Sequence, residues 1–233
     1  MSPAEELREI VSSLKRLMMA DREWGFEPPS LSPSALGYLE KGPGLLRSLE
    51  ELRDSIGDCR RCKLWRGRTN LVFGEGSPKA RLVFVGEGPG RQEDLEGRPF
   101  VGEAGKLLTK IIEDGMRVKR EDVYICNIVK CRPPDNRDPE ADEIAACMPF
   151  LKKQLDLIRP QVVCTLGRIA AQGLLGREFR ITHERGKWVF LGDTPLMPTF
   201  HPAYLLHNPS AKRQVWEDVK EIMRHMGLEV KGN

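Results

Sequence analysis

The sequence predicts an α/β protein of three layers, in which helices cover both faces of a central, mainly parallel four-stranded sheet behind an N-terminal helical extension. Two observations support this fold class. From residue 80 onwards, short apolar runs alternate with amphipathic segments, a pattern typical of parallel strands joined by helical crossovers. The apolar runs, such as residues 81–85, are continuous, which indicates strands that are buried on both faces.

An acidic extension precedes the predicted body. Residues 1–58 carry 7 basic and 11 acidic side chains, whereas residues 59–233 carry 30 and 23. Ser2, Pro3 and Glu5 form a helix-start pattern, and apolar residues then recur at helical spacing to about residue 20. Residues 24–44 are rich in proline and glycine and predict a linker. We therefore divide the chain into residues 1–50 and 51–233; the first helix either docks a partner or folds onto the body.

The elements of the body follow in a regular order. Leucines at helical spacing predict a helix that ends near Gly57. Strands are predicted over 81–85, 123–129 and 160–166, with two short strands over 187–190 and 196–200. Intervening helices are predicted over 104–114, 139–158, 169–175 and 211–226.

The predicted strand ends point to a site. In an open parallel sheet, ligands bind beside the carboxyl ends of the strands. The residues that follow these ends are the glycine-rich turn 86–90, Asn127, Gly167 and His201. We therefore expect these residues to converge.

Composition excludes several classes of protein. No run approaches the ~18 apolar residues of a membrane-spanning helix, and the first thirty residues carry charges throughout, unlike a signal peptide. We expect a cytoplasmic protein. Five of the nine residues 60–68 are cationic, which fits either a nucleic-acid contact or a solvated face.

Four of the six cysteines are candidate metal ligands. One pair has C-x2-C spacing after a helix end, and a second pair has C-x15-C spacing on a strand exit and the following helix. Cys126 and Cys164 fall inside predicted strands and are expected to be buried thiols. Four thiolates suit either tetrahedral zinc or an iron–sulfur cluster, and spacing does not separate the two. The candidate ligands are Cys59, Cys62, Cys131 and Cys147.

The glycine-rich turn does not fit a dinucleotide site. In a G-x-G-x-x-G motif that starts at Gly86, the third glycine would fall at Arg91. Pro89 also stands where a helix should begin to donate amides to a pyrophosphate.

Three sequence blocks resemble the family-four uracil-DNA glycosylases. The first covers residues 86–94 and 97–102, the second 127–134 and the third 201–206. That family carries a four-cysteine iron–sulfur cluster with one ligand directly after an Asn-Ile-Val-Lys run, and Cys131 stands at that position. The resemblance covers most of the body and excludes residues 1–50.

The resemblance implies a DNA repair enzyme that hydrolyses the N-glycosidic bond of uracil in DNA and leaves an abasic site. It implies a [4Fe-4S] cluster on the four candidate cysteines. No lysine falls at a matched pocket position, so we expect a monofunctional hydrolase without a Schiff-base step.

The resemblance also assigns the pocket. A base must leave the duplex before its bond is cut, and Phe100 matches the ring that stacks on it. The Asn127 amide could bond O4 and N3–H of uracil, and His201 matches the donor to O2, where negative charge develops. The alternative, purely structural roles of these residues are a core Phe, a turn-forming Asn and a structural His. Gly86 and Gly88 belong to the turn that would receive the base.

The water-activating group is left open. Other uracil-DNA glycosylases have an Asp at the position of Gly88, and family four has Gly or Ala there. Glu87 and Glu93 are the nearby carboxylates that could orient a water molecule or shape the pocket. A largely dissociative reaction makes little demand for a strong base.

Two segments are predicted to contact DNA. Tyr204, Leu205 and Leu206 resemble the wedge that fills the vacated stack, although the leucines would be core residues if buried. Arg60 and Arg61 belong to the cationic segment. The family often has Arg at the position of His207, so a phosphate contact there would be weaker or pH-dependent.

A second hypothesis belongs to another class. The same fold could serve as a catalytically silent nucleic-acid-binding module that acts with a replication or repair partner through residues 1–50. Such a module would not need the full set of pocket residues, whereas this sequence contains all of them. We expect uracil-containing DNA as the partner of a monomer.

Overall fold

A six-stranded sheet forms the centre of the described part of the chain. The computed structural model describes residues 12–13 and 46–230; the expected N-terminal helix and linker lie outside them, apart from Ser12 and Ser13. The sheet order is β1-β3-β2-β4-β6-β5, with the inner four strands parallel and the two edge strands antiparallel. The predicted parallel four-stranded centre is therefore confirmed. The strands are β1 (Glu75–Gly76), β2 (Leu82–Gly86), β3 (Tyr124–Asn127), β4 (Val162–Leu166), β5 (Val189–Leu191) and β6 (Thr194–Thr199).

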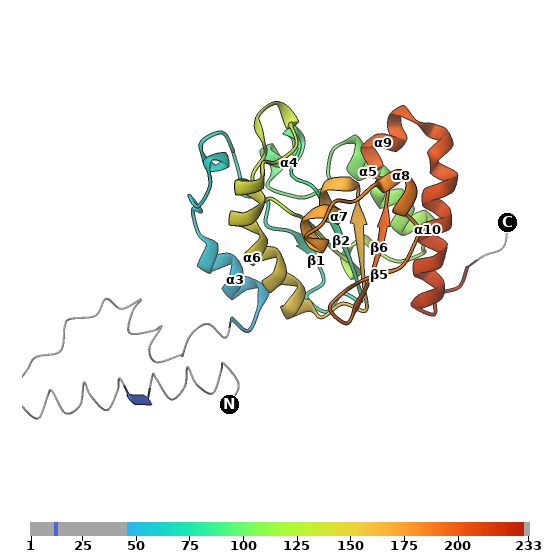
Figure 1. The fold of residues 1–233 in the computed structure, drawn as a ribbon, viewed down its shortest axis with the longest axis horizontal. Coiled ribbons are helices and arrows are strands. Elements are labelled where there is room, and N and C mark those ends of the chain that lie inside the picture. The colour runs from blue at the N-terminus through green and yellow to red at the C-terminus, as the bar shows by residue number, and fades with distance from the viewer. Residues whose placement is uncertain (1–11, 14–45, 231–233) are drawn as a thin grey trace, which may run out of the picture. The chain divides into compact units, whose positions relative to one another are not determined.

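Helices cover both faces of the sheet, as predicted. On β2, Leu82 and Phe84 pack with one group of helices, whereas Val83 and Val85 pack with another, because successive side chains of a strand point to opposite faces. Figure 1 shows α6 and α10 on opposite sides of the sheet. The helices are α3 (Leu49–Ile56), α4 (Arg91–Glu96), α5 (Glu103–Lys110), α6 (Ala141–Ile158), α7 (Arg168–Leu175), α8 (Ile181–Glu184), α9 (Pro202–His207) and α10 (Lys212–His225).

Shorter helical turns complete the body. A π-helical turn continues α5, and 3-10 turns lie in four loops, where they tighten the chain between the regular elements. These turns are η1 (Lys63–Arg66), η2 (Ile111–Gly115), η3 (Arg120–Asp122), η4 (Pro134–Asn136) and η5 (Pro209–Ala211).

The strand ends converge on one edge of the sheet. The Ile128 amide donates to the Gly86 carbonyl at 2.9 Å, which carries the β2–β3 pairing past the last residue of β3. The Gly167 amide donates to the Thr199 carbonyl at 2.8 Å. Gly167 has a φ of +93°, and a Cβ there would lie 3.1 Å from the Cβ of His201. A glycine therefore lets β4 end directly against His201, as the sequence predicted.

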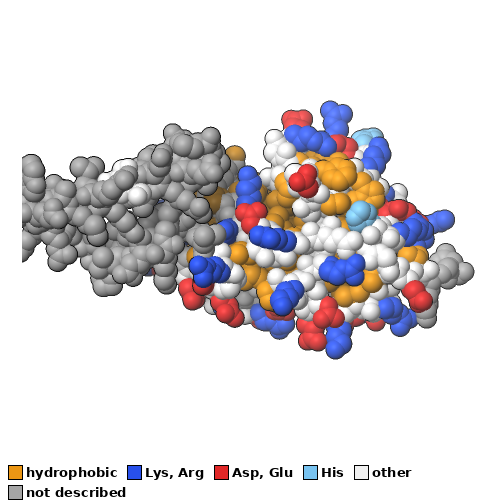
Figure 2. Space-filling model, turned by 90° about the horizontal axis from the view of Figure 1, so that it is seen from below, with side chains coloured by type: hydrophobic (Ala, Val, Ile, Leu, Met, Phe, Trp, Pro, Cys, Tyr) orange, Lys and Arg blue, Asp and Glu red, His pale blue; other side chains and the backbone are white. Residues whose placement is uncertain are grey.

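The opposite edge of the sheet has a mixed surface. Figure 2 looks at the molecule from below, where the amino ends of the strands lie, and shows Lys and Arg side chains interspersed with Asp and Glu. Within the described residues, no helix is long and apolar enough to cross a membrane.

A buried carboxylate braces the end of β6. Asp218 on α10 accepts a hydrogen bond from Thr199 Oγ1 at 2.5 Å and one from Arg185 Nε at 2.9 Å. Thr199 is the last residue of β6 and lies two residues before His201. The brace therefore fixes the segment that carries His201.

We expect Asp218→Ala to lower the free energy of unfolding by about 3 kcal/mol, because breaking a buried ion pair leaves its partner uncompensated. Urea denaturation measures this change. Glu221→Ala is the matched control, since it removes a pair with Arg224 on the exposed side of the same helix and should change little. Equal effects of the two variants would contradict the brace.

Candidate active site

A cavity of about 330 Å³ lies at the carboxyl edge of the sheet. It is lined by predicted pocket residues from the first turn, the end of β3 and the start of α9. Ala104 and the loop after β3 complete its wall. The lining residues are Glu87, Gly88, Pro89, Gly90, Glu93, Phe100, Ala104, Asn127, Pro133, Asn136, Arg137, His201 and Ala203.

Asn127 places a polar group in the wall of this cavity. The residue is 1% exposed, and among the described residues its Oδ1 has no hydrogen-bond partner. Gly86 lies beside it without lining the cavity: a Cβ there would come within 2.4 Å of Asn127 Oδ1 and 2.6 Å of the Phe100 ring. Because an unpaired buried acceptor is costly, Asn127 is suited to bind a ligand that offers an N–H group.

A strained turn holds Phe100 against the cavity. Phe100 has a φ of +52°, in the left-handed region that favours glycine. A Cβ at Gly105 would lie 2.0 Å from the Phe100 carbonyl, so α5 packs directly on this turn. Glu93 Oε1 accepts hydrogen bonds from the amides of Val101 and Gly102, both at 2.9 Å. Glu93 thus shapes the pocket, which was one of its two predicted roles.

His201 presents a neutral imidazole to the cavity. As the N-cap of α9, its Nδ1 accepts a hydrogen bond from the Ala203 amide at 3.1 Å, so the proton resides on Nε2. Burial lowers the pKa of His201 to about 4, against the opposing charge of Glu93. The Phe100 and His201 rings are 5.5 Å apart between centroids. The cavity therefore contains a donor that stays uncharged at neutral pH.

Glu87 is poised to change charge near neutral pH. Burial raises the pKa of Glu87 to about 7; the charge of Asp138 adds to this effect and that of Arg168 opposes it. Asp138 and Arg168 form an ion pair at 2.6 Å. Raised carboxyl pKa values of this kind are a feature of general acids and bases.

Gly88 is closely packed against the segment after β3. A Cβ at Gly88 would lie 2.9 Å from Val129 Cγ2 and 3.5 Å from Pro133 Cδ. The first of these distances is shorter than real contacts allow. A side chain at this position would therefore require Val129 to shift.

The four candidate cysteines line one cavity, as their spacing predicted. Cys126 and Cys164 are buried elsewhere, on β3 and β4. No three His, Cys, Asp or Glu side chains of the described chain form a ready site for one metal ion. The four thiols therefore lie together around one small cavity. They are Cys59, Cys62, Cys131 and Cys147.

Three of these thiols already accept hydrogen bonds, and Cys59 Sγ accepts one from Arg61 Nη1 at 3.4 Å. Arg68 Nη1 donates to Cys131 Sγ at 3.2 Å, and the Lys130 amide donates to Cys147 Sγ at 3.3 Å. Arg68 is held in turn by Asp58 at 2.6 Å. Donors of this kind stabilise thiolate ligands of a metal group, so the donor set fits an iron–sulfur cluster.

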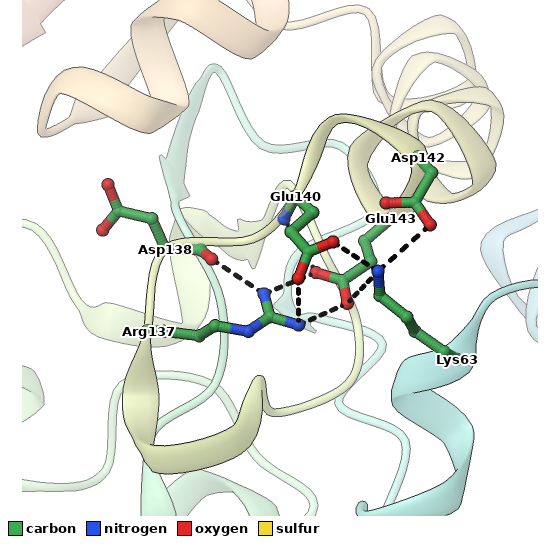
Figure 3. Close-up of polar contacts among 6 residues, drawn as sticks. All are labelled: Lys63, Arg137, Asp138, Glu140, Asp142 and Glu143. Atoms are coloured by element: carbon green, nitrogen blue, oxygen red, sulfur yellow. Dashed lines mark hydrogen bonds and ion pairs between the residues drawn. The ribbon is translucent and has the colours of Figure 1, made fainter.

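An ion network connects the segment around Cys59 and Cys62, here called the cysteine segment, to the wall of the cavity of about 330 Å³ (Figure 3). Arg137 of the cavity wall donates to both carboxylate oxygens of Glu143, at 2.7 and 2.8 Å. Lys63, the residue after Cys62, pairs with Glu140 and lies 3.8 Å from Glu143. The first turn of α6 therefore joins the two regions.

The three residues of the predicted wedge lie on α9 and face in different directions. Tyr204 and Leu206 are 44% and 43% exposed, whereas Leu205 is 1% exposed and packs in the core on the α10 side of the sheet. The helical repeat therefore turns Leu205 inward, away from the exposed surface of α9. Leu205 is a core residue, which is the role that the sequence predicts for a buried leucine in this segment.

The two predicted DNA-binding arginines flank the cysteine segment. Arg60 lies 4.8 Å from the Trp65 ring centroid and pairs with Asp58 at 2.8 Å. Arg61 lies 4.9 Å from the Phe150 ring centroid. Both residues are exposed, and their contact with DNA stays a prediction.

Sequence reasoning missed the pocket loop after β3. Asn136 and Arg137 line the cavity, and Asp135 and Asn136 have φ values of +52° and +54°. The run Pro-Pro-Asp-Asn at 133–136 is a turn signal. It marks a turn without showing that the turn folds over the site.

Comparison with known proteins gives a consistent family. A family description, the Uracil DNA glycosylase superfamily, matches residues 73–220. The chain is 49% identical over 183 residues to a type-4 uracil-DNA glycosylase of Sulfurisphaera tokodaii, which covers 75% of this chain and 83% of that protein. It is 48% identical over 177 residues to a type-4 uracil-DNA glycosylase of Thermotoga maritima, which covers 74% and 92%. A type-5 uracil-DNA glycosylase of Pyrobaculum aerophilum is 29% identical, with 76% and 84% covered.

We expect His201 to remain the neutral Nε2–H tautomer from pH 8 down to pH 5.5, since burial lowers its pKa to about 4. Nitrogen-15 NMR of the imidazole measures both the tautomer and its titration. The unfolded chain takes up this proton near pH 6.5. The His201 contribution to stability is therefore complete above that pH and declines as the pH falls toward 4. A titration midpoint near 6.5 in the folded protein would contradict the assignment.

Proposed function

The chain belongs to the type-4 uracil-DNA glycosylases of the uracil-DNA glycosylase superfamily, and we propose that it is a DNA repair enzyme that hydrolyses the N-glycosidic bond of uracil in DNA. The product is an abasic site. One observation carries the proposal: a neutral His201 donor and an Asn127 acceptor that has no partner among the described residues line the same cavity as Phe100.

These side chains match the groups of uracil. A base flipped out of the duplex would stack on Phe100, whose backbone is packed directly against Gly105 of α5. Asn127 Oδ1 would accept the N3–H proton, and its amide nitrogen would donate to O4. A cytosine has no N3–H to offer, so the buried acceptor would remain unpaired and the wrong base would be rejected.

His201 would stabilise the leaving group. Negative charge develops on uracil O2 as the bond breaks, and a donor fixed in advance lowers the energy of that charge. The Ala203 amide holds Nδ1, so the ring needs no reorientation to present Nε2–H. A neutral donor also avoids burying a cation before the charge develops.

Glu87 would orient the attacking water. The Glu93 carboxylate is bound by two backbone amides, and Gly88 has no side chain, which leaves Glu87 as the carboxylate of the cavity free for this role. The reaction is largely dissociative, so the water needs orientation more than a strong base. None of the residues lining the described cavity is a lysine, which agrees with a monofunctional hydrolase.

The DNA would be held at the exposed tip of α9. Tyr204 and Leu206 are the exposed apolar residues there and would fill the gap left by the flipped uracil. Arg60 and Arg61 would contact phosphates from the cysteine segment.

The four cysteines would bind a [4Fe-4S] cluster. The family resemblance implies this group, and the arrangement supports it, because all four thiols line one cavity and three of them accept hydrogen bonds of the kind that stabilise thiolate ligands. When bound, the cluster would fix the cysteine segment to the body and take no part in bond cleavage. Its thiolate-to-iron absorbance is expected at about 400 nm.

Residues 1–50 would form a separate extension that contacts a replication or repair partner. The body at 51–233 would act as a cytoplasmic monomer. An apolar face at helical spacing on residues 7–18 is the sequence feature that supports a partner contact.

Incubation of the cluster-containing protein with an oligonucleotide carrying one uracil, followed by alkali, tests the activity. We expect strand cleavage only after alkali. His201→Ala should lower turnover by about 10²–10³-fold, the typical effect of removing one such donor, with little loss of duplex binding. His183→Ala, an exposed histidine outside the site, is the control and should match the wild type. Tight binding without cleavage would favour the silent binding module.

The rate should also depend on the charge of Glu87. Because burial raises the pKa of Glu87 to about 7, the ionised form is lost as the pH falls, and kcat/KM should fall below pH 7. Glu87→Gln should be slower and should lose this pH dependence. Glu96→Gln, an exposed carboxylate on α4, should keep it. A Glu87→Gln profile with the same acid limb would exclude Glu87 as its source.

A further inference from the structure

Lys130 is a fully buried lysine that the proposed chemistry does not use. It is 1% exposed. Its Nζ donates to the Asn127 carbonyl at 2.8 Å and to Gln154 Oε1 at 2.6 Å. Both acceptors are neutral oxygens, whereas a buried ammonium group is costly unless a negative charge compensates it. The position therefore calls for an explanation.

Gln154 is oriented specifically for this lysine. Its Nε2 donates to the Phe73 carbonyl at 2.9 Å and to the Tyr124 hydroxyl at 3.0 Å. Both amide hydrogens are therefore used, and Oε1 faces Lys130. An acceptor fixed in this way holds the ammonium at one point behind the end of β3.

The contact with Asn127 reaches the base pocket. Asn127 is the last residue of β3, and Lys130 folds back across three residues onto its carbonyl. The same Asn127 lines the cavity, and its buried side-chain oxygen has no hydrogen-bond partner among the described residues. Any movement of the Asn127 backbone would displace the amide that reads uracil.

The other end of Lys130 belongs to the cysteine cavity. Its amide donates to Cys147 Sγ at 3.3 Å, the next residue is Cys131, and Lys130 itself lines that cavity. Thiolate ligands of a cluster would place negative charge beside the buried ammonium. The cluster would thus supply the compensation that the neutral acceptors do not.

We propose that Lys130 is a positioning residue that joins the cluster to the uracil pocket. Its ammonium holds the Asn127 carbonyl, and with it the base-reading amide, while the cluster compensates its charge. This role rests on the proposed function for what Asn127 reads and on the proposed cluster for the compensating charge.

The test compares cluster-containing wild-type protein with Lys130→Met, which keeps an unbranched side chain one atom shorter and removes the donors and the charge. We expect the inhibition constant of free uracil to rise about tenfold, since a hydrogen bond from a charged group is lost. The reduction midpoint of the cluster should become more negative, because a neighbouring positive charge is removed. Lys152 is an exposed lysine on α6, and Lys152→Met should change neither value.

Gln154→Met provides a second variant if Lys130→Met does not fold. It removes the orienting acceptor and keeps the charge, so uracil inhibition should weaken while the midpoint stays near that of the wild type. Unchanged uracil inhibition in the variants that fold, in protein that cleaves uracil-DNA, would overturn the proposal. A wild-type protein that does not cleave would contradict the proposed function instead. The midpoint of Lys130→Met would then decide whether the lysine serves the cluster.

Discussion

The site depends on the space left by the missing side chain at Gly86. In the parallel register of β2 and β3, Gly86 stands directly opposite Asn127, and a Cβ there would strike both the Asn127 amide and the Phe100 ring. The absence of that one atom lets the Asn127 amide and the Phe100 ring both approach the same point. The left-handed turn at Phe100 and the hydrogen bonds from backbone amides to Glu93 keep the ring in the place that Gly86 leaves open.

Helix α6 supports this point from behind through its buried face. Glu143, Cys147 and Gln154 are all buried on this helix, at spacings of four and seven residues, which place them on one side of it. Glu143 binds the pocket loop through Arg137, Cys147 belongs to the cysteine cavity, and Gln154 holds Lys130. The buried face of α6 therefore makes one polar contact with each of three regions: the pocket loop, the cysteine cavity and Lys130.

The sequence allowed the parallel centre of the sheet and the convergence of its strand ends to be predicted. Continuous apolar runs indicate buried parallel strands, and Asn127 and His201 stand at the ends of two such runs. It could not separate Leu205 from Leu206, since the direction of each depends on where α9 begins. The strand β1 has two residues and exists only through its pairing with β3, so no local pattern marks it. The pocket role of Asn136 was missed for a related reason: its turn signal is local, whereas its position over the cavity is set by tertiary packing.

The contact between Gly88 and Val129 restricts how this pocket can change over evolutionary time. A Cβ introduced at position 88 would lie 2.9 Å from a methyl group of Val129, so an aspartate there requires Val129 to shift or to become smaller. The effect of a substitution at one position therefore depends on the residue at the other, which makes the two sites epistatic. A smaller residue at position 129 would make a carboxylate at position 88 easier to accommodate.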